Sequence, residues 1–488
     1  MKHFLKNGLW GLVGAVILLA AILMWRGIES RKLAELKPWH KIVMKHEFRA
    51  KQAVPTMTFE DYVALERLVF EELEQRVYQQ LPPQEDLPYN RYNAQSYSHP
   101  ERFPKNWNRS FEMRPEDVAG GVLMLHGLTD SPYSMYAASQ IFYDQGFYVL
   151  GLRTPGHGTV PAELTRTSWE DWLAAAGIGL EHVRAHVGTN VPVYICGYST
   201  GGTLALKLAL DALETEEADL PDALVLFSPA LAVNAFGLLA DWHKPLAIFP
   251  FFEKFAWTAV NPEYEPFKYT SFAKHAGGQV YQLARIVQKQ VERLERKGTL
   301  GNLPPVTAFQ SVVDSTVINT ALVTEFYDKL VPNQSELIIF DVNQHRHVKH
   351  FIKERYRTGI LGIEQTKPLS YTLTVITNEH ENSLNVVAKT KPVQAEDFEQ
   401  PVPLHLAWPE DVYSLSHVAL LFPPDDAVYG IIDTRENPES FKLGALSPHG
   451  ETTVLNVSLE HLMRIRSNPF FPFVKQRLID LLSADNAS

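Results

Sequence analysis

The stretch VPVYICGYSTGG at residues 191–202 contains the residue types and the spacing that nucleophilic catalysis by a serine requires. A β-branched, apolar run leads into the pattern G-x-S-x-G, formed by Gly197, Ser199 and Gly201. This pattern is typical of a nucleophile elbow, a tight strand-to-helix turn that exposes the serine Oγ and needs small residues on either side. Ser199 is therefore a candidate nucleophile for acyl transfer; a surface Gly-Ser turn is the alternative.

The segments around this motif have the character of alternating strands and helices. Residues 191–196 form an apolar run typical of a buried strand, and residues 200–213 form an apolar helical pattern. A second helix is predicted from the capping box Ser168-x-x-Asp171 to about residue 187. Further strands are predicted at 122–125, 147–152, 223–227 and 336–340. Such alternation predicts a mostly parallel sheet with helices on both faces and a site at the carboxyl ends of its strands.

Composition narrows the class of protein. A chain of 488 residues can form several domains, or one catalytic domain with insertions. Its net charge of -11 argues against a nucleic-acid partner. The single cysteine, Cys196, excludes an intrachain disulfide and is expected to be a small buried residue at a strand end.

The amino-terminal residues predict a membrane segment. From Asn7 to Trp25 the sequence has no charge, and at about 1.5 Å per residue it is long enough to cross a roughly 30 Å hydrocarbon layer. We expect residues 1–26 to be an uncleaved, single-pass anchor in the cell membrane; a cleaved signal peptide is the alternative. Lys and Arg flank both sides, and the positive-inside rule favours a cytoplasmic catalytic domain.

The rest of the chain divides into a connecting part and a catalytic part. Residues 27–117 are predicted to be a juxtamembrane helix that begins at the capping box Thr58-x-x-Asp61, followed by a proline-rich connector. Residues 118–488 are predicted to be the catalytic domain, with a carboxyl-terminal helical extension at about 457–483.

Three motifs in this domain resemble a known family. They are HGLTDSP at 126–132, PGHG at 155–158 and GYSTGG at 197–202. In this order and at these separations, the chain resembles the α/β-hydrolase superfamily, in particular bacterial carboxylesterases and monoacylglycerol lipase-like serine hydrolases, over roughly residues 118–425. The resemblance implies an α/β-hydrolase fold and speaks less clearly about substrate.

The resemblance also implies partners for the serine, because a serine hydroxyl needs an imidazole base and a carboxylate that orients it. An apolar run that stops at Asp314 resembles the acid loop of the family, with Asp341 or Asp241 as alternatives. His417, in YSLSHVALLF, resembles the late histidine loop, although a histidine packed in the core is the alternative. The remaining motif histidines, His126 and His157, match structural positions.

The oxyanion site is implied in the same way. In the family, the backbone N–H groups after the nucleophile and after the His-Gly pair stabilise the tetrahedral oxygen, and here these belong to Thr200 and Leu128. The positive end of the helix that begins near Thr200 adds to this stabilisation.

Two long segments distinguish the chain from a minimal hydrolase. Residues from about 232 to 304 are rich in aromatic side chains and are predicted to form a cap, which either favours acyl chains or packs its own core. Residues from about 342 to 410 form an insertion with a predicted hairpin, 371–376 with 385–388. Its histidines, His345, His347 and His350, are expected to form a solvated basic patch rather than a metal site, and no cofactor or metal is expected.

Together these features predict a membrane-anchored serine hydrolase that cleaves carboxylic esters through an acyl-enzyme. Its substrate would be a small-molecule or lipid ester, such as a monoacylglycerol or a lysophospholipid. Two alternatives remain: a serine peptidase of aminopeptidase type on the same fold, and a binding protein on a catalytically inactive hydrolase fold.

Overall fold

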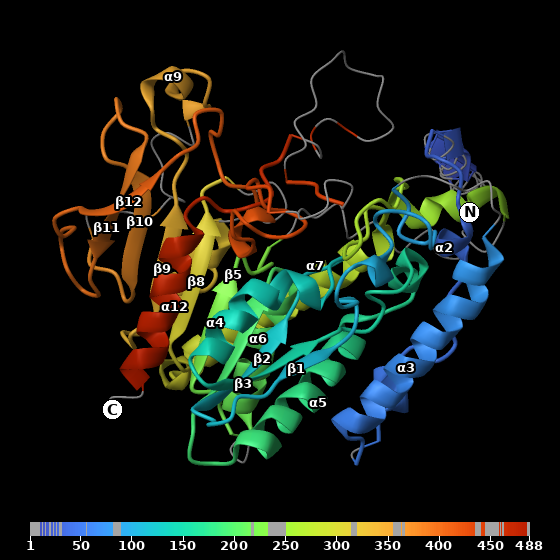
Figure 1. The fold of residues 1–488 in the computed structure, drawn as a ribbon, viewed down its shortest axis with the longest axis horizontal. Coiled ribbons are helices and arrows are strands. Elements are labelled where there is room, and N and C mark those ends of the chain that lie inside the picture. Colours follow the sequence, from blue (N-terminus) through green and yellow to red (C-terminus); the bar gives the residue numbers. More distant parts are fainter. Residues whose placement is uncertain are drawn as a thin grey trace, which may run out of the picture.

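The computed structural model describes residues 32–54, 56–81, 89–215, 219–232, 250–313, 320–354, 367–434, 441–444 and 463–485, with scattered positions between 10 and 28 and at 363, 458 and 460. Within these residues a ten-stranded sheet forms the centre of the molecule, in the order β1-β3-β2-β4-β5-β8-β9-β10-β11-β12 (Figure 1). Neighbouring strands from β3 to β10 run parallel, whereas β1, β11 and β12 run antiparallel to their neighbours. The strands are β1 Phe111–Met113, β2 Gly120–Leu125, β3 Phe147–Leu152, β4 Val193–Tyr198, β5 Ala223–Phe227, β8 Val306–Ser311, β9 Glu336–Phe340, β10 Thr372–Asn378, β11 Asn385–Lys391 and β12 Val402–Ala407.

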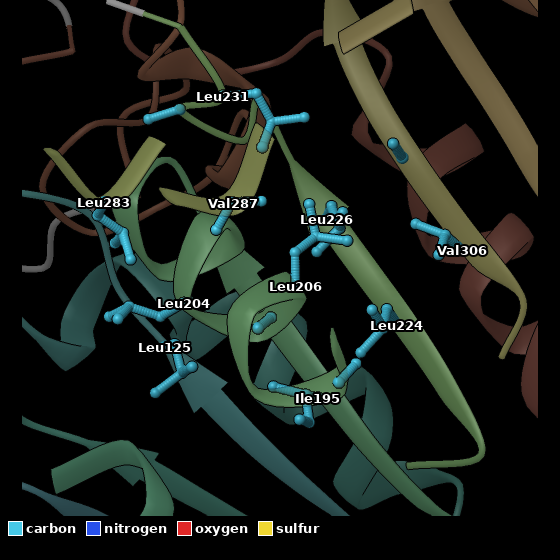
Figure 2. Close-up of a cluster of buried hydrophobic side chains, with 14 of the residues drawn as sticks. Leu125, Ile195, Leu204, Leu206, Leu224, Leu226, Leu231, Leu283, Val287 and Val306 are labelled. Atoms are coloured by element: carbon cyan, nitrogen blue, oxygen red, sulfur yellow. The ribbon is translucent and has the colours of Figure 1, made fainter. Parts of the chain in front are cut away.

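Helices cover both faces of this sheet, which explains why its central strands are apolar along their whole length. Successive side chains of a strand point to opposite faces, so Leu123 and Leu125 of β2 enter one core cluster and Val122 and Met124 enter the other. Side chains of α6 and α7, shown in Figure 2, complete the first cluster together with those of α5. The second cluster is completed by α4 and α12. These helices are α4 Tyr136–Asp144, α5 Trp169–Val187, α6 Thr200–Glu214, α7 Lys274–Lys297 and α12 Phe471–Asp485. The predicted fold class, a mostly parallel sheet between helices, is confirmed.

Both predicted capping boxes are present. The Thr58 hydroxyl accepts a hydrogen bond from the Asp61 N–H at the start of α3 Phe59–Arg76, and Ser168 with Asp171 forms the same arrangement at α5. Each box satisfies two backbone N–H groups that the first turn of a helix leaves without an intrahelical acceptor.

The shorter elements are α2 Pro38–Lys41, α8 Thr320–Thr324, α9 Arg346–Lys349, and the two-stranded pair β6 Trp257–Ala259 and β7 Phe272–Ala273.

The part of the chain before the sheet packs closely on it. Arg153, just after β3, forms ion pairs with Glu47 at 2.9 Å and Glu66 at 3.2 Å, and the arginine side chain is 1% exposed. In the proline-rich stretch predicted to be a connector, Arg91 donates to the Asn108 carboxamide and to the Gly158 carbonyl. Residues 89–113 thus hold the loop after β3 in place, although no local sequence pattern indicated this contact.

The predicted cap and insertion are described in part. Among the described cap residues, Phe255, Trp257, Phe267 and Tyr269 are buried, whereas Trp242 and Phe249 lie outside the described residues. The insertion adds β10, β11 and β12 to the sheet, and the predicted hairpin corresponds to the antiparallel pair β10 and β11. Here β10 lies parallel to β9, so the insertion extends the central sheet.

The predicted membrane anchor covers residues 1–26, of which 1–9, 12, 15, 19, 20, 23 and 26 lie outside the described residues. Among the positions that the structure does describe, no helix has both the length and the apolar character needed to cross a bilayer.

Candidate active site

Ser199 lies on the turn between β4 and α6, with the strained backbone that a nucleophile elbow requires. Its φ of 52° and ψ of -116° are unusual for a residue with a side chain and cost of order 1–3 kcal/mol. Backbone hydrogen bonds offset this cost: the Ser199 N–H donates to the Phe227 carbonyl at 2.9 Å, and the Ser199 carbonyl accepts from Ala230 at 3.0 Å. The conformation is thus fixed by the next strand, β5, and by the loop that follows it.

The two motif glycines are required by close backbone contacts. A Cβ on Gly197 would lie 2.4 Å from the Gly201 carbonyl oxygen. A Cβ on Gly201 would lie 2.1 Å from the carbonyl oxygen of Leu125, the last residue of β2. Both distances are far below van der Waals contact, so α6 can approach the sheet only if these positions lack a side chain.

The amino-terminal end of α6 provides hydrogen-bond donors beside the serine. Thr200, Gly201 and Gly202 occupy the first turn, where backbone N–H groups have no intrahelical acceptor. The helix dipole places partial positive charge at the same end. An oxygen that becomes negative next to Ser199 would therefore be stabilised there.

The predicted second oxyanion donor, Leu128, lies in a tight turn after β2. The Asp130 N–H donates to the Gly127 carbonyl at 3.2 Å, and Thr129 has a φ of 66°. The cap residue Tyr269 fixes this turn from outside, because its N–H donates to the Thr129 carbonyl at 2.8 Å.

An ion pair that the sequence did not predict holds the same turn. The Lys268 Nζ lies 2.9 Å and 3.0 Å from the two carboxylate oxygens of Asp130. Burial raises the pKa of Asp130, while Lys268 and, more weakly, His417 act in the opposite direction. Two residues so far apart in the chain share no local pattern, and only the acidic residue inside the HGLTDSP motif could have drawn attention to this position.

His417 lies beside the elbow. Its side chain is buried, and its ring centroid is 5.0 Å from that of Tyr198, the residue before Ser199. The loop that carries it is tied to β8, since the Ser311 hydroxyl donates to the Leu415 carbonyl at 2.9 Å. The structure therefore brings the predicted base next to the residue that precedes the predicted nucleophile.

The other two motif histidines have structural contacts. His126 Nε2 accepts from the Thr154 N–H at 3.1 Å, so its proton lies on Nδ1, which is 2.9 Å from the Gly127 carbonyl. Burial lowers the pKa of His126 to about 3 and places that of His157 well below its usual value. Both rings are therefore neutral at pH 7 and connect the loops after β2 and β3.

Comparison with known families agrees with this geometry. Residues 116–347 match the family described as serine aminopeptidase, S33, and this range begins just before β2 and ends in α9. The chain has an α/β-hydrolase fold.

Two curated relatives match shorter segments of the chain. The chain is 36% identical over 89 residues to the thermostable monoacylglycerol lipase of Bacillus sp. (strain H-257), and 31% identical over 98 residues to a carboxylesterase of Bacillus subtilis (strain 168). These segments cover 18% and 20% of the chain, and only 34% and 39% of the two relatives.

Solved structures also resemble it. A structure reported with the metagenome-derived lipolytic enzymes LipS and LipT has a TM-score of 0.38 and 20% identity. The match covers 48% of this chain and 88% of the chain in that structure. The monoacylglycerol lipase of Paleococcus ferrophilus has a TM-score of 0.34 and 19% identity, and the match covers 47% of this chain and 88% of the lipase.

The predicted acid of this hydrolase fold, Asp314, lies outside the described residues, as does the alternative Asp241. The strand before it, β8, ends at Ser311, at the same edge of the sheet as Ser199. The other alternative, Asp341, is described: Thr377 donates to it at 2.8 Å, and Val342 and Gln344 supply further N–H donors. Among the described residues, none of its hydrogen-bond partners is a histidine.

Two of the three histidines of the insertion, His345 and His347, contact each other. The rings of His345 and His347 are 4.7 Å apart and perpendicular. Throughout the described part of the chain, no group of three or more His, Cys, Asp or Glu side chains is arranged to hold a metal ion.

Proposed function

We propose that the chain is a membrane-anchored serine hydrolase that cleaves carboxylic esters, with Ser199 as nucleophile, His417 as base and Asp314 as the acid that orients it. The observation that carries the proposal is the strained backbone of Ser199 close to the buried ring of His417. The His417 ring packs against Tyr198, the residue before Ser199. Such strain persists only where the surrounding structure imposes it, and it concentrates at sites with a chemical role.

The reaction follows from these groups. The Ser199 Oγ attacks the ester carbonyl carbon while His417 accepts the hydroxyl proton, and the N–H groups of Leu128 and Thr200 stabilise the oxyanion. The intermediate then breaks its bond to the alcohol, which leaves with the proton from the imidazolium. Water, deprotonated by His417, attacks the acyl-enzyme in turn, and its collapse releases the carboxylic acid and restores the serine.

Lipid esters are the substrate class we propose, because one curated match is named a monoacylglycerol lipase and the other a carboxylesterase. A membrane anchor at residues 1–26 would place the site near such lipids. We expect the protein to reside in the cell membrane with its catalytic domain in the cytoplasm. Resistance of the full-length protein to carbonate extraction, with protection from external protease in intact cells, would agree with this location, and release by carbonate would contradict it.

A panel of short-chain and long-chain p-nitrophenyl esters tests the activity. We expect the wild-type protein to hydrolyse them and Ser199→Ala to lose about 10⁴-fold or more in kcat, because the triad acts as a unit. The absence of turnover across the whole panel, or unchanged turnover in the variant, would contradict the proposal.

An aminopeptidase activity is suggested by the description of the matching family. Such an enzyme needs an acidic group for the substrate ammonium, and Asp130 is an acid close to the site, but Lys268 already neutralises it at 2.9 Å. We therefore expect ester turnover to exceed turnover of amino-acid arylamides. The opposite ratio would favour the peptidase.

A further inference from the structure

Residues 345–354, HRHVKHFIKE, form an exposed basic segment on a chain of opposite net charge. The segment contains three Lys or Arg and three His against one Glu, whereas the whole chain has a net charge of -11. Arg346, His350 and Lys353 are exposed, and Phe351 between them is 89% exposed. Lys349 is paired with Glu381 at 3.3 Å, whereas Phe351 is flanked in sequence by the exposed His350 and Lys353. An aromatic side chain so fully in contact with water is unusual for a folding role.

The base of this segment is fixed, so the exposed part projects from a rigid support. Asn343 is fully buried; its N–H donates to the Tyr413 carbonyl at 2.8 Å and its Nδ2 to the Val412 carbonyl at 2.9 Å. Asn378, at the end of β10, donates to the Asn343 carboxamide oxygen at 3.1 Å. Tyr413 itself is 59% exposed and adds a second aromatic ring beside the base.

The position of the segment relates it to the candidate active site. It follows β9, which runs parallel to the strands that lead to Ser199, so it lies at the same edge of the sheet. Figure 1 shows α9 beyond the ends of β8 and β9. The residues that hold its base, Val412 and Tyr413, also begin the loop that carries His417.

We propose that residues 345–354 dock on the surface of an anionic lipid bilayer, with Arg346 and Lys353 on the phosphate groups and Phe351 in the interface. Charge complementarity favours this occupant: each Lys or Arg at an anionic surface strengthens binding about fivefold. An exposed Phe side chain is favoured at the boundary between head groups and acyl chains. The net negative charge of the chain repels the same surface elsewhere, so the contact also orients the protein. The edge of the sheet that bears Ser199 would then face the bilayer.

A fluorescent probe on the segment tests this proposal in the full-length protein. The only native cysteine, Cys196, is fully buried, so an environment-sensitive thiol probe would react at an introduced His350→Cys. The matched control places the probe at Glu181→Cys, where the native side chain is 73% exposed near the end of α5, at the opposite edge of the sheet. Both proteins are reconstituted into vesicles of phosphatidylcholine, with or without phosphatidylglycerol.

We expect a blue shift of the probe at position 350, but not at position 181, when phosphatidylglycerol is present. The double substitution Arg346→Glu and Lys353→Glu should weaken binding of the segment to vesicles that contain phosphatidylglycerol at least about 25-fold. Phe351→Ser should remove the blue shift. Lys289→Glu with Lys297→Glu on α7 changes the net charge equally and should have no effect.

Three results would overturn the proposal: no shift with anionic vesicles, equal shifts at both positions, or a shift caused by soluble polyphosphate but not by vesicles. The last would indicate a site for another polyanion. Hydrolysis of p-nitrophenyl acetate by the same samples reports separately on the proposed hydrolase activity, so failure of one claim does not imply failure of the other.

Discussion

At the scale of single residues, the site depends on where side chains are absent as much as on where they are present. Ser199 can hold its unusual φ because Gly197 and Gly201 allow α6 to approach β2 and β4. A methyl group at position 201 would overlap the Leu125 carbonyl. Leu125 belongs to β2, and its backbone cannot move aside without disturbing the sheet.

The substitution Gly201→Ala tests this requirement. We expect it to destabilise the protein by about 3 kcal/mol and to reduce ester turnover strongly, because the helix must move away from β2. Gly177→Ala is the control: position 177 lies within α5, and a Cβ there would have no neighbouring atom within 4 Å, so this substitution should stabilise the protein by about 0.5–1 kcal/mol. Chemical denaturation measures both, and equal effects of the two substitutions would contradict the packing argument.

Much of the residue-scale site could be predicted from sequence, since it rests on local patterns. The elbow around Ser199 follows from G-x-S-x-G after an apolar run, and the structure shows the turn that this motif predicts. The Asp130–Lys268 pair could not be predicted, because its members are brought together only when the cap folds over the loop after β2. The assignments of Asp314 and His417 as acid and base remain predictions.

At the scale of elements, Lys268 and Tyr269 of the predicted cap contact the turn after β2, which carries the proposed oxyanion donor Leu128. The Lys268 side chain is 20% exposed and that of Asp130 is 6% exposed, so the pair is largely removed from water. Loss of the Lys268 cation would leave the Asp130 carboxylate buried and unpaired with it, in the turn that carries Leu128.

Lys268→Met should therefore lower kcat about tenfold with little change in KM, and should destabilise the protein by about 2 kcal/mol at pH 7. Burial already raises the pKa of Asp130, and without the cation this pKa rises further. A carboxyl group whose pKa is raised in the folded state lowers the free energy of unfolding of the protein as the pH increases. The difference in unfolding free energy between Lys268→Met and the wild type should therefore shrink when the pH is lowered. Denaturation at several pH values measures this, with Lys268→Arg as the rescuing control; a difference that grows at low pH would contradict it.

Element boundaries were well predicted where periodicity or capping is strong. The predicted strands 147–152, 223–227 and 336–340 coincide with β3, β5 and β9, and Ser168 caps α5 as expected. The short edge strand β1 and the parallel alignment of β10 with β9 were not predicted, since both depend on contacts with segments that are distant in sequence.

At the scale of the whole molecule, the described residues between 32 and 110 pack on the sheet as one unit. Arg153 connects them through Glu47 and Glu66, and all three side chains are at most 5% exposed. The Tyr62 hydroxyl of α3 also donates to the Arg153 carbonyl at 2.6 Å.

Replacing this arginine, in Arg153→Met, should destabilise the protein by about 3–5 kcal/mol, because two carboxylates would remain buried without a cation. The control is Arg114→Met, which removes an exposed pair with Glu112 and should cost less than about 1 kcal/mol. Denaturant midpoints followed by circular dichroism measure both. A small effect at position 153 would show that the amino-terminal part is only loosely attached.

The central claim is that the Ser199 hydroxyl is activated by His417, and labelling with a fluorophosphonate tests it most directly. We predict one covalent adduct per chain, located at Ser199 by peptide mass spectrometry, and a loss of labelling rate of about 10³-fold or more in His417→Ala. An unlabelled wild-type protein, an adduct on another residue, or an unchanged rate in His417→Ala would contradict the account.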